Sequence, residues 1–137
     1  MTPEIEQRVR ERAINNPYVS FLGIKLSRVE DGYIEAVMPI TDEQKQYSGV
    51  SHGGVLAAFA DTIAGLAAYT KTSLGKDVLT AEMKISFLRA ARGNSIQAKG
   101  YSIKSGRKIH FCECDIFSDE ILVAKASGTF CVVEPQI

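Results

Sequence analysis

Apolar and polar positions near the N-terminus repeat with the period of a helix. A Thr-Pro pair typical of a helix start precedes apolar residues spaced four apart, at Ile5, Val9 and Ala13. The sequence Asn15-Asn16-Pro17 is a common helix stop. We therefore expect a short surface helix over about 3–14, within an N-terminal segment of residues 1–16, and a turn around 21–23.

From residue 24 the period changes to two, as in β-strands. Alternating segments over 24–30 and 33–38 flank Asp31-Gly32, which predicts a hairpin. The polar stretch 39–51 carries no strand pattern and indicates a loop. Four further segments alternate over about 78–89, 95–104, 107–118 and 121–133. The breaks between them are short, which favours antiparallel neighbours.

Between the two groups of strands, residues 53 to about 73 predict one long helix with two different faces. One face is bulky and suited to packing on a sheet, with Leu56, Phe59, Ile63 and Leu66. The other is small, with Ala57, Ala58, Ala64, Gly65 and Ala68 around Asp61. A helix that is apolar on nearly all sides must be enclosed. We therefore expect an α+β domain over 1–137, with an antiparallel sheet of about six strands wrapped around this helix.

Charge and cysteine content exclude several classes of protein. Sixteen basic and sixteen acidic residues cancel, so the chain lacks the excess positive charge of a nucleic-acid-binding protein. Residues 1–12 are too charged for a secretion signal, and the apolar run 55–69 is shorter than the ~20 residues that span a bilayer. Three cysteines in strand segments are expected to be buried thiols. These features predict a cytoplasmic protein that binds neither nucleic acid nor membrane.

Asp61 is the strongest candidate for chemistry. An ionised carboxylate in an apolar helix is costly unless it is paired or used. A satisfied structural acid and a catalytic acid are both compatible with that position. The small side chains around Asp61 favour a functional role, because they leave room for a ligand or for a second chain.

The second candidate is the start of the same helix, Ser51-His52-Gly53-Gly54. The first N–H groups of a helix have no partner within it and can hold an oxyanion or polarise a carbonyl. A simple loop-to-helix turn that needs glycine would look the same. Residues 49–53 also match G-x-S-x-G, but no strand precedes them and the chain is too short for that hydrolase fold.

Spacing along the helix separates these two candidates. Nine residues place His52 and Asp61 roughly 13 Å apart and on opposite sides of the helix. They cannot easily contact the same atom within one chain. If both serve one site, that site is expected to lie between two copies, with the helix start of one facing Asp61 of the other.

The remaining polar residues give weaker indications. The cations Arg89, Arg92, Lys104, Arg107 and Lys108 lie near the ends of predicted strands, where they could bind phosphates or simply form a solvated rim. Two histidines and scattered acids give no recognised metal-ligand spacing, so no metal site is expected. His110 lies within a strand and is expected in the core or at a dimer contact.

The segments YSGVSHGGVLAAFADTIAGLAAYT and VLTAEMKISFLRAARGNSI together resemble the hotdog-fold acyl-CoA thioesterases of the phenylacetate-degradation and 4-hydroxybenzoyl-CoA type. The resemblance runs from about residue 23 to 133. It rests on His52-Gly53-Gly54, on Asp61 nine positions after the histidine, and on the F-L-R-x-A-R-G stretch at 87–93. The combination is far more specific than any single element.

The resemblance implies a hotdog fold, hydrolysis of an acyl- or aryl-CoA, and a homodimer that pairs again into a dimer of dimers. It also implies an active site shared between chains, with CoA, as part of the substrate, along their interface. From the cations near the strand ends, we take Arg89, Arg92, Arg107 and Lys108 as the candidates for binding CoA. No separate cofactor is implied.

The resemblance also assigns roles to site residues. It implies Asp61 as general base or nucleophile, the backbone amide of Gly53 or Gly54 next to His52 as the group that polarises the carbonyl, and Thr80 as a hydroxyl that orients water. Relatives often carry asparagine where this chain has Gln46, which leaves the contact of that residue open.

Two other functions have to be weighed. A hotdog hydratase or dehydratase would pair a histidine with a carboxylate, and Leu66, five positions after Asp61, is not a histidine. A non-catalytic acyl-CoA-binding module would be stabilised by its ligand without releasing free CoA.

Overall fold

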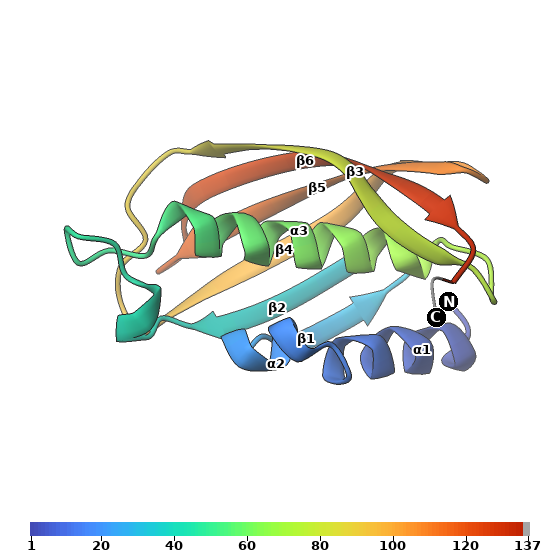
Figure 1. Cartoon of the computed structure of the whole chain (residues 1–137), viewed down its shortest axis with the longest axis horizontal. Coiled ribbons are helices and arrows are strands. Elements are labelled where there is room, and N and C mark those ends of the chain that lie inside the picture. Colours follow the sequence, from blue (N-terminus) through green and yellow to red (C-terminus); the bar gives the residue numbers. More distant parts are fainter. Residues whose placement is uncertain (136–137) are drawn as a thin grey trace.

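The helical and strand periods of the sequence correspond to two layers, helices and a sheet, in a computed structural model that describes residues 1–135. A six-stranded antiparallel sheet, with strand order β1-β2-β4-β5-β6-β3, wraps around one long helix (Figure 1). The helices are α1 (Pro3–Ile14), α2 (Pro17–Leu22) and α3 (Gly53–Thr70), with a short 3-10 helix at Asp42–Gln44. The strands are β1 (Lys25–Glu30), β2 (Tyr33–Pro39), β3 (Asp77–Phe87), β4 (Ser95–Ser105), β5 (Ile109–Ser118) and β6 (Ile121–Val133). This α+β hotdog arrangement confirms the predicted fold class.

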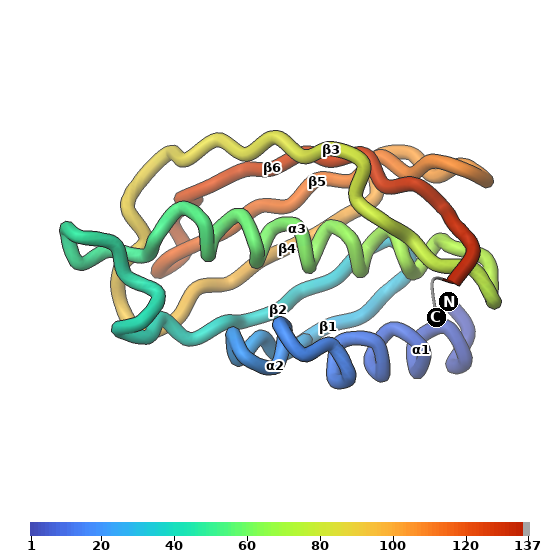
Figure 2. Tube along the Cα trace, viewed as in Figure 1, coloured from blue at the N-terminus to red at the C-terminus, as the bar shows by residue number. Residues whose placement is uncertain are grey.

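The sheet places β3 at one edge and β1 at the other, although the chain passes through the central helix between β2 and β3 (Figure 2). The predicted hairpin is present, with Glu30 opposite Tyr33 across the Asp31-Gly32 turn. The last three strands follow one another antiparallel along the sheet. β3 pairs with β6 on one side only, and its register shifts between Thr80 and Glu82. β3 therefore presents an unpaired edge of 11 residues.

The central helix lies unusually close to the sheet at β4. Phe59 and Ile63 on the bulky face of α3 are fully buried. Gly100 of β4 lies so close to α3 that a β-carbon added there would be 2.7 Å from the carbonyl oxygen of Ile63. Ala64 and Ala68, expected on the more open face, are buried as well, and α1 contacts α3 in addition to the sheet. By length and composition α3 could pass for a membrane span, but 61% of it is buried inside the protein.

The N-terminal segment contains a helix that the sequence pattern did not predict. A turn was expected around 21–23, but α2 occupies Pro17–Leu22, so that expectation was wrong over most of its length. Asn16 accepts hydrogen bonds from the N–H groups of Tyr18 and Val19. Gly23 then ends the helix with a left-handed backbone (φ 75°). The Asn-Pro pair therefore ends α1 and also starts α2, since it suits an N-cap followed by a first-turn proline.

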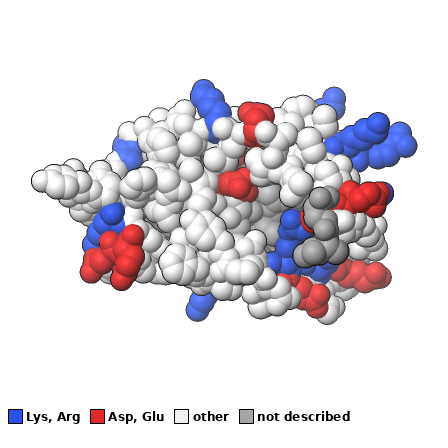
Figure 3. Space-filling view, in the orientation of Figure 1, with Lys and Arg blue, Asp and Glu red and all other residues white. Residues whose placement is uncertain are grey.

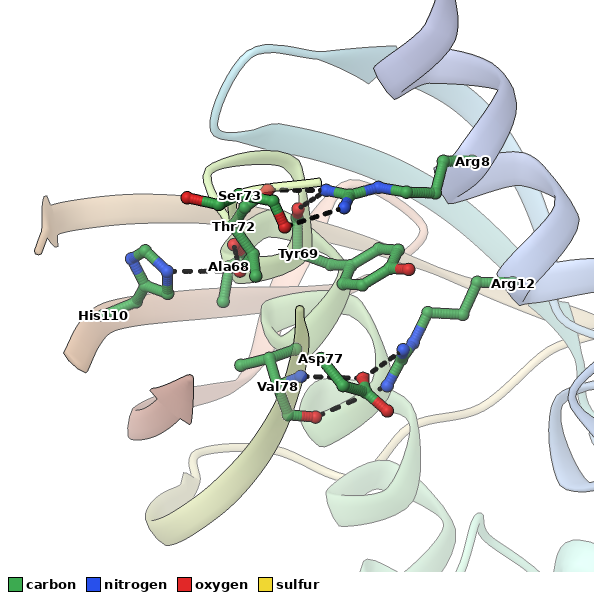
Figure 4. A network of polar contacts seen from close by, with 9 residues as sticks. All are labelled: Arg8, Arg12, Ala68, Tyr69, Thr72, Ser73, Asp77, Val78 and His110. Carbon is green, nitrogen blue, oxygen red and sulfur yellow. Dashed lines mark hydrogen bonds and ion pairs between the residues drawn. The ribbon is translucent and has the colours of Figure 1, made fainter. Parts of the chain in front are cut away.

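Two arginines of α1 fasten this segment to the end of α3 (Figure 4). Arg8 donates hydrogen bonds to the carbonyl oxygens of Tyr69, Thr72 and Ser73 at 2.9, 2.7 and 3.1 Å. These carbonyls lie at the negative end of the helix dipole, which a guanidinium stabilises. Arg12 pairs with Asp77, and the guanidinium groups of Arg8 and Arg12 lie over the Tyr69 ring, 4.2 and 4.3 Å from its centroid.

The central helix is shorter than expected. α3 ends at Thr70, three residues before the predicted end at about residue 73.

Two of the three cysteines, and one of the two histidines, are in the core. Cys112 and Cys114 are buried, whereas Cys131 is partly accessible. Burial raises the pKa of the Cys112 thiol to about 12. His110, expected either in the core or at a dimer contact, is completely buried in the core. Its Nε2 lies 3.2 Å from the Thr72 hydroxyl. Burial, together with the nearby Lys71 charge, lowers the pKa of His110.

Candidate active site

The start of α3 presents one free backbone donor. His52 is the N-cap, and its ring Nδ1 accepts a hydrogen bond from the N–H of Gly54 at 2.8 Å. This bond assigns the proton of the neutral ring to Nε2. The N–H of Gly53 donates no hydrogen bond within residues 1–135. Of the two glycine amides singled out in the sequence, Gly53 is thus free to contact a ligand and Gly54 is already engaged.

The free donor borders a hollow at the end of β3. This hollow has a volume of about 310 Å³ and is lined by Gly53 together with Gln46, Ser51, Phe87 and Arg89 among others. A β-carbon added to Gly53 would lie 3.2 Å from the Phe87 ring. The side-chain oxygen of Gln46 accepts a hydrogen bond from the N–H of Ser48. Ser51 is only 5% exposed, which argues against the G-x-S-x-G serine as a nucleophile.

Asp61 lies at the middle of α3 and is half-buried. The Thr80 hydroxyl donates a hydrogen bond of 2.7 Å to Asp61 Oδ1. No donor among residues 1–135 reaches the second carboxylate oxygen, Oδ2. Thr80 comes just before the register shift of β3, where the strand turns this hydroxyl toward the helix. The pair therefore offers one carboxylate oxygen to a ligand while the other is held by the strand.

Asp61 and Thr80 line a second hollow, of about 200 Å³, between α3, β3 and the N-terminal segment. Its apolar wall includes Ala13 and Val19, neither of which was predicted as a site residue from the sequence. Nothing in their spacing distinguishes them from ordinary core positions, since they reach the site only through the packing of α1 and α2. Figure 3 shows that this face of the molecule is largely uncharged, with charged side chains gathered mainly toward its ends.

The candidate residues are not all brought together within one chain. Asp61 and Thr80 share one hollow, and Gln46 and Gly53 share another. His52 and Gly54 line a third, of about 370 Å³, beside the aromatic side chains of α2. The single chain thus holds an acid with a hydroxyl in one place and a free amide donor in another.

The four cations expected to bind CoA are also divided. Arg89 and Arg92 lie between β3 and β4, whereas Arg107 and Lys108 lie between β4 and β5. Because β4 has 11 residues, its two ends are about 35 Å apart. Arg89 donates a hydrogen bond to the Leu122 carbonyl at 3.0 Å. One chain therefore cannot use all four cations for one phosphate group.

Residues that could hold a metal ion do not gather anywhere in the part of the chain that the structure describes: residues 1–135 contain no cluster of three or more histidine, cysteine, aspartate or glutamate side chains. A network of charged side chains lies on the outer face of the sheet. There, Lys125 contacts Asp115 at 2.8 Å and Glu113 at 3.3 Å. Burial is the main reason that the pKa of the neighbouring Tyr101 is raised. This network faces away from α3 and from Asp61.

Comparisons with known proteins identify the family of this chain. Residues 48–125 match the family model of the thioesterase superfamily. The chain is 31% identical over 102 residues to the proofreading thioesterase EntH of Cronobacter turicensis, covering 74% of each chain. It is 32% identical to a thioesterase of Haemophilus influenzae of known structure, with a TM-score of 0.84 over 96% of this chain and 92% of that one. A thioesterase family protein from Silicibacter pomeroyi superposes with a TM-score of 0.91 at 25% identity, covering 96% and 99%. The chain belongs to the thioesterase superfamily and is a thioester hydrolase.

Proposed function

We propose that this enzyme hydrolyses the thioester of an acyl- or aryl-CoA to the free acid and CoA, in a site shared by two chains. The observation that carries the proposal is the hydrogen bond between Thr80 and Asp61, which leaves the other carboxylate oxygen free at a hollow of about 200 Å³. A carboxylate held in this way can accept a proton from water or attack a carbonyl carbon. Both routes need a hydrogen-bond donor for the carbonyl oxygen.

The free N–H of Gly53 is the donor best placed to serve that oxygen. It lies at the positive end of an 18-residue helix, where the helix dipole favours developing negative charge. A preorganised donor of this kind typically contributes about 3 kcal/mol to lowering the barrier. Because the N–H of Gly54 is bonded to His52, of the two glycine amides only the N–H of Gly53 is left for the carbonyl oxygen of the substrate. His52 holds the turn, and its Nε2–H faces the neighbouring hollow.

The edge strand supports a two-chain site. The start of α3 lies against Phe87 and its middle contacts Thr80, so α3 runs antiparallel to β3. In our proposal the unpaired β3 edges of two copies join antiparallel about a twofold axis near Met83. The Phe87 end of one chain then lies beside the Thr80 end of the other. This places Gly53 of each chain near Asp61 of its neighbour.

The exposed surface of the edge fits such pairing. Leu79, Phe87 and Leu88 are about half-exposed in the single chain. A long edge strand with exposed apolar side chains is a template for pairing with another chain. The half-buried small residues Ala57, Ala58 and Gly65 on α3 would let the helices of two copies approach closely. A second pairing of such dimers into a tetramer is the further assembly we propose.

The same twofold axis offers a site for the CoA phosphates. It brings the Arg89 and Arg92 end of one sheet beside the Arg107 and Lys108 end of its neighbour. Lys108 adjoins β6 next to β3, since its carbonyl accepts a hydrogen bond from the N–H of Val132 at 2.8 Å. Arginine and lysine side chains at such a junction would bind phosphates through charge-assisted hydrogen bonds.

In the reaction we propose, attack on the carbonyl carbon creates a negatively charged oxygen that Gly53 N–H stabilises. If water attacks, Asp61 takes its proton, the C–S bond breaks, and the thiolate of CoA leaves and is then protonated. If Asp61 attacks, the same bond breaks, and water then hydrolyses the resulting mixed anhydride. Thr80 holds Asp61 in place for either route.

Release of free thiol from a panel of acyl- and aryl-CoA esters tests this proposal. Asp61→Asn keeps an acceptor oxygen for Thr80 but removes the base and nucleophile, so we expect kcat to fall at least about 100-fold. Asp119→Asn, in the exposed β5–β6 turn, is the matched control and should remain active. Full activity of Asp61→Asn would remove Asp61 from the mechanism. Consumption of unsaturated or hydroxylated acyl-CoA without free thiol would indicate a hydratase or dehydratase instead.

A further inference from the structure

A groove between α1 and β1 adjoins the hollow that contains Asp61. It is the largest of the hollows described, with a volume of about 410 Å³. Apolar side chains line it, among them Ile14 of α1, Ile24 just before β1 and Leu26 of β1. Ile14 is 73% exposed, so the groove carries an apolar wall at the surface. Its charged lining residues are both cations, Arg10 and Lys25.

Ala13 is a wall residue of both spaces. It lines the α1–β1 groove and also the Asp61 hollow. It lies in the last turn of α1 and is 6% exposed. Its side chain is a single methyl group, so the two spaces approach each other at a small residue.

The Asp61 hollow alone is too small for a long acyl chain. An apolar cavity of about 150 Å³ holds one benzene molecule, and the hollow has about 200 Å³. Roughly six carbons of a substrate therefore fill it. A longer chain must continue past its walls, and the groove that begins at Ala13 is apolar and has about twice the volume.

Resting on the function proposed above, we propose that the enzyme acts on medium- and long-chain aliphatic acyl-CoA. The first carbons of the chain lie in the Asp61 hollow and the distal carbons lie in the α1–β1 groove. Ala13 is the residue that determines how long a chain can pass. Each methylene buried in the groove is worth about 0.8 kcal/mol, which corresponds to about a fourfold gain in kcat/KM.

Two substitutions change the passage in different ways. Ala13→Leu adds three carbons at the junction of hollow and groove and narrows the path. Ile14→Lys places a charge on the apolar wall of the groove at a position that is mostly exposed, so it should fold normally even if Ala13→Leu does not. Glu11→Leu is the control, because it also places a leucine on α1, at a residue that lines neither space.

The experiment measures kcat/KM for butyryl-, octanoyl-, dodecanoyl- and palmitoyl-CoA, with a thermal melt of each variant. We expect the wild type to prefer the longer chains. We expect Ala13→Leu and Ile14→Lys to lower dodecanoyl-CoA hydrolysis about tenfold or more, the equivalent of about two buried methylenes. In both variants the loss of butyryl-CoA hydrolysis should be smaller than the loss of dodecanoyl-CoA hydrolysis, because a four-carbon chain ends before the groove. Glu11→Leu should match the wild type throughout.

Several results would overturn the inference. One is a wild type that cleaves butyryl-CoA but not dodecanoyl-CoA. That result would be consistent with the proposed thioesterase function but would show that the α1–β1 groove does not bind the acyl chain. Another is a chain-length profile that neither Ala13→Leu nor Ile14→Lys alters. A wild type that cleaves no acyl-CoA of any length would refute the proposed function itself, and the inference with it.

Discussion

Replacing Gly53 by proline removes a single proposed catalytic group, the backbone N–H that no acceptor uses within residues 1–135. Gly53 is the first residue of α3, a position where proline is favoured because its fixed φ suits a helix start. The preceding residue, His52, has φ −64° and ψ 138°, a backbone that is compatible with a following proline. The helix should therefore form as before.

The matched control is Gly53→Ala, which keeps the N–H. Both substitutions add a β-carbon about 3.2 Å from the Phe87 ring, so each requires the same small movement of that side chain. Phe87 is 53% exposed and has room to move. The Gly53→Ala variant thus accounts for the effect of the β-carbon, and the remaining difference reports the loss of the N–H together with the ring carbons that take its place.

The expected magnitude follows from the charge on the carbonyl oxygen in the transition state. Loss of one preorganised donor costs about 3 kcal/mol, so kcat of Gly53→Pro should be about 100-fold below that of Gly53→Ala. kcat and kcat/KM should fall together, because the interaction strengthens in the transition state. Thiol release over a range of substrate concentrations measures both, and a urea titration at fixed protein concentration checks the fold.

Mixing variants tests whether the donor serves the other chain. A dimer of one Gly53→Pro chain and one Asp61→Asn chain would contain one site with both groups intact. After unfolding and refolding an equal mixture, about a quarter of wild-type activity should return if chains pair at random. Equal kcat for Gly53→Pro and Gly53→Ala would refute the role of the N–H, and no recovery on mixing would refute the shared site.

Three further predictions concern stability. Gly100→Ala should cost about 1–3 kcal/mol of unfolding free energy in a urea titration, because its β-carbon would press on the carbonyl of Ile63 in a closely packed core; a loss below 0.5 kcal/mol would contradict the close approach. Arg8→Ala should lower the melting temperature by several degrees, since three carbonyl oxygens lose a charged donor, and an unchanged melting temperature would show that α1 is held by other contacts. Burial lowers the pKa of His110 below its usual 6.5, so the unfolded chain binds more protons than the folded protein below about pH 6.5. The free energy of unfolding should therefore fall as the pH drops below about 6.5, by up to about 1.4 kcal/mol per pH unit. His110→Gln should reduce that slope in urea titrations at several pH values, and an equal slope in both proteins would exclude His110 as its source.

The sequence predicts the parts of this fold that depend on period and composition. Alternation marks every strand to within about two residues, as with 78–89 for Asp77–Phe87 and 107–118 for Ile109–Ser118. The apolar period of α3 predicts an enclosed helix, and a lone Asp61 within it indicates a site. Residue identity alone is sufficient for these inferences, because burial imposes the pattern.

The contents of the site depend on packing that no local pattern records. Thr80 was assigned only through the resemblance, since its contact with Asp61 arises where β3 shifts register. Ala13 and Val19 reach the Asp61 hollow through the packing of α1 and α2, and α2 was missed because its starting residues also end α1. The use of Gly54 by His52 depends on the orientation of one imidazole ring, which the sequence does not encode locally.

The enclosure of α3 has a consequence for how the protein is made. The helix is complete at Thr70, but β3–β6, which cover much of it, end only at Val133. At 5–20 residues per second, a ribosome needs roughly 3–13 s to add those strands. During that interval the nascent chain contains α3, an apolar helix of nearly membrane-spanning length, without the strands that cover much of it. The helix must therefore be kept from aggregating and from entering the membrane-insertion machinery until β3–β6 have been synthesised.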